Sequence, residues 1–248
     1  MRGAATFLLI ACVSWVQPAV AQDGPRLAQA ASQAAKEFKA HIDKMARAKG
    51  SLDLSAPPAS DLLAKMCDVN PLQGLARPIG ADLPWLTEWV SACASSTMLA
   101  LSFGTNPRSA DYVEVMSKNE KRYEDELTQI IDFSLRGGVR VHIAARDFLD
   151  ALPERDRKSR QNNYNNLRAG LISTVMSSLD FLVNDTKLPN AKRLSAALRD
   201  IAPDWATLLS DKERADLLSQ IANTREKVSD ADVSANLAAM SSTLSATR

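Results

Sequence analysis

The chain has 248 residues, of which 46% are apolar and 24% are charged, and its 30 basic residues nearly balance its 29 acidic ones. This composition is that of an ordinary globular protein and argues against a disordered chain. A net charge of +1 also argues against the basic footprint of a nucleic-acid-binding protein and against a strongly acidic solvating tail. We therefore expect no nucleic-acid partner.

The first 21 residues have the pattern of a secretory signal peptide. Arg2 gives a positive start, the stretch 4–16 is almost wholly apolar, and the small residues that signal peptidase recognises occupy 19–21. Cleavage there would leave 227 residues with 29 charges of each sign, in a periplasmic or secreted protein. The alternative is a lipoprotein anchored through Cys12, because residues 9–12 resemble a lipobox. Against it, Cys12 comes early and no polar tether follows it.

No later segment has the roughly 18 to 20 uninterrupted apolar residues of a membrane span. The nearest, 85–103, contains Glu88 and several serines and threonines, which is typical of a buried helix. We expect no transmembrane segment once the signal peptide is removed.

Two cysteines remain in the mature chain, Cys67 and Cys93. An even number in an oxidising compartment favours a disulfide. The loop it would close has about 27 residues, for which the chain-entropy model gives roughly 3.5 kcal/mol. Two free buried thiols or a redox-active pair are the alternatives, but the Cys-x-x-Cys spacing of redox catalysts is absent.

Apolar residues recur at spacings of three and four along most of the chain, which predicts helices. We expect an all-α fold, an irregular bundle of about seven to nine helices with one disulfide and no sheet. Residues 22–228 would form a single helical domain. The Ala- and Ser-rich segment 229–248 would either pack as a helix, for example on the first helix, or fray. The expected helices are 26–49, 60–67, 83–103, 109–136, 139–152, 167–183, 191–201, 204–209 and 210–228.

Three local patterns affect the boundaries of these helices. Gly137 and Gly138 predict the end of a helix at Arg136. The alternation in 139–144 is strand-like, yet no second convincing strand exists to pair with it, so continuation as a helix is favoured and the strand stays open. Ser210 and Glu213 match a capping box at the start of a helix.

The sequence contains no recognisable catalytic or cofactor motif. Its two histidines, His41 and His142, fall in different predicted helices and match no zinc, di-iron or covalent haem pattern. A serine-nucleophile elbow and a glycine-rich phosphate loop are also absent. We therefore expect no metal and no cofactor.

Glu88 is a weak candidate for a catalytic acid because it lies between Trp85 and Trp89, where an apolar setting would raise its pKa. The plainer interpretation is a residue at the boundary of the core, with its carboxylate at the surface. The two tryptophans are also candidates for a ligand or partner surface.

A run of basic residues is a second candidate surface. It falls within the polar stretch 153–166, which we interpret as an exposed connection between helices, where charge is expected in any case. The four basic residues are Arg155, Arg157, Lys158 and Arg160.

These observations favour an exported, non-enzymatic helical protein that acts by contact with a protein partner in the cell envelope, such as an adaptor, a chaperone-like factor or an assembly factor. One alternative is a hydrolase of envelope polymers that uses Glu88. Another is a carrier of a small ligand, with a pocket between the tryptophan-bearing helices.

Overall fold

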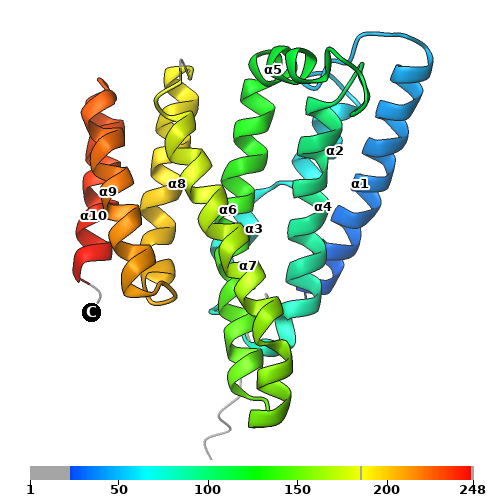
Figure 1. Cartoon of the computed structure of the whole chain (residues 1–248). Helices are drawn as coiled ribbons and strands as arrows, with labels where there is room; N and C mark the ends of the chain where they lie inside the picture. Colours follow the sequence, from blue (N-terminus) through cyan, green and yellow to red (C-terminus); the bar gives the residue numbers. More distant parts are fainter. Residues whose placement is uncertain (1–22, 185, 247–248) are drawn as a thin grey trace, which may run out of the picture.

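The computed structural model describes residues 23–184 and 186–246, and within them every regular element is a helix (Figure 1). The all-α class is therefore confirmed. The expected signal peptide and Cys12 lie outside the described residues. The elements are α1 (Gly24–Arg47), α2 (Ala59–Met66), α3 (Val69–Gly74), the short 3₁₀ turn η2 (Gly80–Asp82), α4 (Leu83–Leu101), α5 (Tyr112–Arg122), α6 (Glu124–Asp150), α7 (Glu154–Phe181), α8 (Leu188–Ala206), α9 (Asp211–Lys227) and α10 (Ala231–Ala246).

Two hydrophobic cores share helix α6, which runs between α1 and α4 on one side and α8 and α10 on the other (Figure 1). The first core buries Phe38, Trp89 and, from α6, Phe133. The second core buries Trp205 and, from α6, Val139. A helix that is apolar on more than one face needs partners on each of them. The position of α6 in the middle of the molecule follows from that requirement.

A buried carboxylate fixes α8 against α6. Asp132 is 3% exposed, and its two oxygens accept from Nε of Arg136 and from Nε of Arg193, each at 2.7 Å. Near the start of α6, Glu124 accepts a hydrogen bond from the backbone N–H of Lys187 at 2.7 Å. A buried charge is tolerated when it is paired or hydrogen-bonded in this way.

The expected disulfide is confirmed as a pair. Cys67, directly after α2, is bonded to Cys93 in α4, with a Cα–Cα distance of 5.3 Å. The segment between the two cysteines contains α3 and η2. It is held on α6 by Arg140, which donates to the carbonyl of Leu75 at 3.1 Å, and by Asp147, which accepts from the N–H of Gly80 at 2.7 Å.

The expected end of a helix at Gly137 and Gly138 is wrong, because α6 continues through both glycines to Asp150. A Cβ atom on Gly137 would lie 2.5 Å from Cγ2 of Val90 on α4. Glycine is therefore required here by the close approach of two helices. Residues 139–144 are helical, which settles the open choice between helix and strand. The chain instead breaks between α5 and α6 at the buried Tyr123.

Two further boundaries differ from expectation. The polar stretch after Pro153 is not a connection, because α7 already begins at Glu154, and its Tyr164 bonds to His142 on α6. The two helices expected over 191–209 are one helix, α8, which contains Pro203. Proline removes one hydrogen bond from a helix. Here the burial of apolar residues on both sides of it outweighs that loss.

The C-terminal segment forms a packed helix. Buried residues of α10 at spacings of three and four, including Val233, Leu237 and Met240, lie against α8 and α9, across the molecule from α1 (Figure 1). The capping box before α9 is confirmed, since Ser210 accepts from the N–H of Glu213 while the Glu213 carboxylate accepts from the N–H of Ser210.

Candidate functional site

The two tryptophans singled out from the sequence have different environments. Trp89 is 1% exposed, its indole Nε1 donates to the carbonyl of Met66 at 3.0 Å, and its ring lies 5.3 Å from that of Phe133. It is part of the core, so the expectation of a partner or ligand surface is wrong for Trp89. Trp85 is half-buried, and its indole donates to Asp82 at 3.1 Å.

Glu88 lies on the exposed side of the same helix. Its carboxylate accepts a hydrogen bond of 2.6 Å from the hydroxyl of Ser32, which joins α4 to α1. This is the position of a boundary residue. The indole of Trp89 points into the core, so it does not provide the apolar setting that an acid catalyst would need.

The four basic residues 155, 157, 158 and 160 occupy the first turns of α7. Arg157 is half-buried and donates to the carbonyls of Asp150 and Leu152, at 2.9 and 3.1 Å, so it caps the end of α6. Lys158 pairs with Glu154 at 3.0 Å. Two of the four are thus engaged locally, while Arg155 and Arg160 are exposed.

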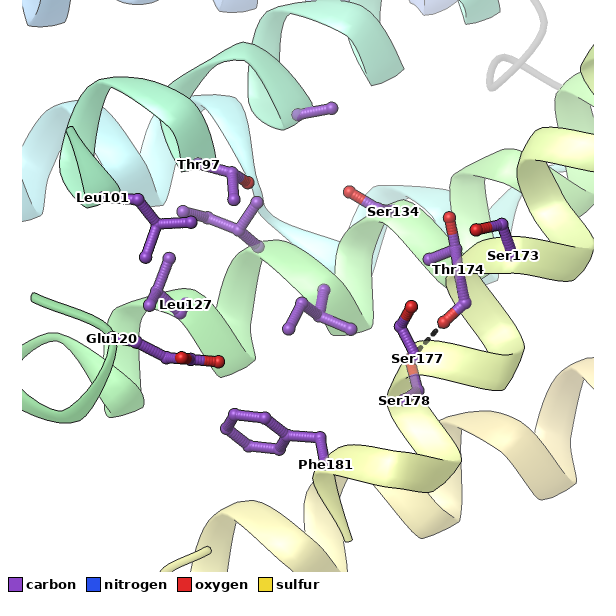
Figure 2. Close-up of a pocket in the computed structure, with 13 residues that line it drawn as sticks. Thr97, Leu101, Glu120, Leu127, Ser134, Ser173, Thr174, Ser177, Ser178 and Phe181 are labelled. Atoms are coloured by element: carbon purple, nitrogen blue, oxygen red, sulfur yellow. Dashed lines mark hydrogen bonds between the residues drawn. The ribbon is translucent and has the colours of Figure 1, made fainter. Parts of the chain in front are cut away.

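A groove that was not expected from the sequence lies between α4 and α7, with α6 as its floor (Figure 2). Its volume is about 380 Å³. The lining residues are Ala94, Thr97 and Leu101 of α4, Glu120 of α5, Leu127, Ile130, Ile131 and Ser134 of α6, and Ser173, Thr174, Ser177, Ser178 and Phe181 of α7.

The floor of the groove is mainly aliphatic, and its walls carry small or hydroxyl-bearing side chains. Two of these hydroxyls donate to carbonyls of their own helix, Thr174 to Gly170 at 3.0 Å and Ser178 to Thr174 at 2.8 Å. Such bonds satisfy the hydroxyl donors locally. These two side chains therefore leave mostly carbon atoms facing the groove.

Both walls belong to long uncharged segments. No charged residue occurs in 89–107, which includes most of α4, or in 169–179 of α7, although about one residue in four of the whole chain is charged. The exposed residues of these segments include Met98, at 51% exposure, and Ala94. Exposed helix faces of soluble proteins normally carry charge. Depletion of charge is a property of the central parts of protein interfaces.

One charged residue lies at the end of this groove. Glu120, near the end of α5, is close to Leu101 and Leu127, and the ring of Phe181 lies at the same end (Figure 2). The Glu120 carboxylate forms no hydrogen bond or ion pair with any other residue that the structure describes. An occupant of the groove would therefore meet an apolar surface with one unpaired negative charge at its end.

A buried histidine–tyrosine pair lies outside the groove, between α6 and α7. His142 is fully buried, and its Nε2 is 2.9 Å from the hydroxyl of Tyr164, while its Nδ1 has no hydrogen-bond partner among the residues that the structure describes. Burial lowers the pKa of His142 to about 4, with further contributions from the positive charges of Arg168 and Arg146, opposed by Glu213. The ring is therefore neutral at pH 7.

This low pKa makes the stability depend on pH. Below pH 6.5 the histidine of the unfolded chain takes up a proton that the folded protein takes up only near pH 4. We expect this group to lower the free energy of unfolding by about 3 kcal/mol between pH 7 and pH 4. Urea unfolding at several pH values measures it, and His142→Gln should remove this part of the loss. An equal loss in wild type and variant would contradict the prediction.

The fold and the groove together define an all-α protein with a Cys67–Cys93 disulfide and a mainly apolar groove whose α4 and α7 walls carry no charge. Within the described residues no group of three or more metal-ligating side chains occurs, and no helix is long and apolar enough to cross a membrane. Comparisons with protein-family models, with curated proteins and with solved structures found no match to this chain.

Proposed function

We propose that this chain is an exported, non-enzymatic helical protein that acts by binding a protein partner of the cell envelope in the groove between α4 and α7. Export is supported by the signal-peptide pattern of residues 1–21, and a disulfide such as Cys67–Cys93 is typical of proteins in an oxidising compartment.

The observation that carries the proposal is the absence of charge along both walls of the groove. A helix that faces only water gains nothing from an uncharged surface, and solubility favours charge there. A surface that binds a partner has to lose its water, and charged groups make that loss costly. The uncharged faces of 89–107 and 169–179 are therefore best explained by an occupant that covers them.

A second candidate function is a carrier of a small apolar ligand. The volume of about 380 Å³ lies within the range of roughly 300–1,000 Å³ that small-molecule sites occupy. An organic extract of the purified protein, analysed by mass spectrometry, distinguishes the two functions, because a carrier would release a stoichiometric small molecule.

We expect the substitution Ser177→Arg to lower the affinity for the partner at least tenfold, which corresponds to about 1.4 kcal/mol. It places a charge on the exposed wall of the groove, where an apolar contact would have to bury it. The measurement is capture of the partner from an envelope extract by the mature protein, with quantification of each captured protein.

Ser219→Arg is the matched control, because Ser219 is an exposed serine on α9, outside the groove. Thermal unfolding should show that both variants remain folded. A partner that is captured equally well by Ser177→Arg and by wild type would contradict binding in the groove.

A further inference from the structure

The groove has the geometry that receives a further helix in a helix bundle. Helices α4 and α7 both pack on α6, and the groove separates them (Figure 2). The lining residues extend from Ala94 to Leu101 on α4 and from Ser173 to Phe181 on α7. At 1.5 Å of rise per residue, the lining segment of α4 is about 10 Å long and that of α7 about 12 Å long. Residues i and i+7 of a helix are separated by the same distance, about 10 Å.

The uncharged surface is wider than the groove itself. On α4 it includes the exposed Ser91, Ser95 and Met98, and on α7 it includes the exposed Ala169 and Gly170. A single acyl chain in the groove would leave these residues in water. A helix is about 10–12 Å across with its side chains, so it would rest on both rims while its apolar side chains fill the groove.

The walls also permit a close approach of a helix backbone. The distance between packed helices is about 8–10 Å and depends on the side chains at the contact. Ala94 on one wall, with Ser173 and Ser177 on the other, are small and keep that distance short. Large side chains come mainly from the floor and from the end that contains Leu101 and Phe181.

The charge at the end of the groove restricts the occupant further. A helix that covers the groove would remove water from Glu120, and burying an unpaired carboxylate is costly. A Lys or Arg of the occupant at this end would compensate that loss, and the ring of Phe181 adds a surface that favours a cation. Lys187 is already paired with Asp125 at 2.9 Å. Lys121, next to Glu120 in the sequence, forms no ion pair with Glu120 or with any other described residue. Neither lysine therefore neutralises the Glu120 carboxylate.

We infer that the occupant is an amphipathic helix of the protein partner, with apolar residues at i, i+3 or i+4 and i+7 and with a Lys or Arg over Glu120. This inference rests on the proposed function and adds the chemistry of the partner to it. The charge pair fixes the direction in which the helix lies in the groove.

The test starts from the full mature chain with a photo-crosslinking amino acid at Ser177 or at Ala94, used in intact envelopes. Mass spectrometry of the crosslinked product identifies the partner segment, which is then synthesised as a peptide. We expect its apolar residues at helical spacing and a basic residue at one end. The affinity of the peptide is measured for wild type, for Glu120→Gln and for the control Glu114→Gln, another exposed carboxylate on α5.

Glu120→Gln should weaken binding about five- to tenfold at low salt, and Glu114→Gln should change it less than twofold. Replacing the basic residue of the peptide by Gln should cause a similar loss in wild type and no further loss in Glu120→Gln, as expected for two groups that act as a pair. The difference should shrink as the salt concentration rises.

The possible failures are distinguishable. If Ser177→Arg abolishes capture while Glu120→Gln binds the peptide like wild type, the inference is wrong and the proposed function stands. The same holds for a crosslinked segment without helical spacing. A crosslinked lipid or small molecule, or no crosslinked product at either position, overturns both.

Discussion

Replacing Trp89 by alanine is expected to lower the free energy of unfolding by about 3–5 kcal/mol, the range found for large aromatic residues in a core. The side chain is 1% exposed, and its indole N–H bonds to the carbonyl of Met66. Alanine would leave a cavity beside Phe133 and an unpaired buried carbonyl, and both effects reduce stability. Urea unfolding followed by circular dichroism measures the change.

Trp85 is the natural control for this experiment, because it is the same residue type one turn earlier on α4. It is only half-buried and bonds to the nearby Asp82, so Trp85→Ala should cost about 1–2 kcal/mol. Equal losses for the two variants would show that Trp89 does not have the core position described above.

Removing the disulfide is expected to lower the free energy of unfolding by about 3.5 kcal/mol, because the bridge closes a loop between residues 26 positions apart. In a protein of this size that corresponds to a fall in Tm of roughly 7–14 °C. The double variant Cys67→Ala/Cys93→Ala avoids burying polar groups, since both sulfur atoms lie in the first core. Thermal and urea unfolding of wild type and variant provide the values.

A reducing agent is the control for the bridge itself. It should destabilise wild type by a similar amount and leave the double variant unchanged, because the variant has no bridge to lose. Labelling of two thiols in the unreduced protein, or a variant as stable as wild type, would count against the bridge.

The fold could be predicted to the extent that it depends on local patterns. The spacing of Ala31, Ala34, Phe38 and Ile42 predicted α1, and these residues are buried in the structure. The capping box at Ser210 was correct because both of its partners lie within one helical turn. Patterns that involve neighbours in sequence are readable because their geometry follows from the helix itself.

The predicted helix boundaries are wrong where a residue contacts a part of the chain that is distant in sequence. Glycine is typical of a helix end, but Gly137 instead lets α6 approach Val90 of α4, which lies more than 40 positions earlier in the sequence. Likewise, the polar start of α7 has no apolar periodicity of its own. Arg157 and Tyr164 hold it on α6 instead. Sequence propensity alone does not contain such contacts.

The groove could not be derived from sequence for the same reason, since three helices and the end of α5 have to be placed before it exists. A usable sign was nevertheless present in the absence of charge over 89–107 and over 169–179. The pattern of 85–103 is typical of a buried helix, whereas one face of α4 is exposed. The two tryptophan neighbours of Glu88 suggest an apolar setting for its carboxylate, yet Trp89 points into the core.

The central position of α6 has a consequence for how the chain acquires its structure. Phe133 completes one core and Val139 the other, so neither core is complete until this helix has formed. Without α6, the helices before Glu124 lack one of the surfaces against which they pack, and so do the helices after Pro153. During synthesis from the N-terminus, the first core is therefore completed only after α6 has formed. The groove forms only when α7 has packed on that same helix.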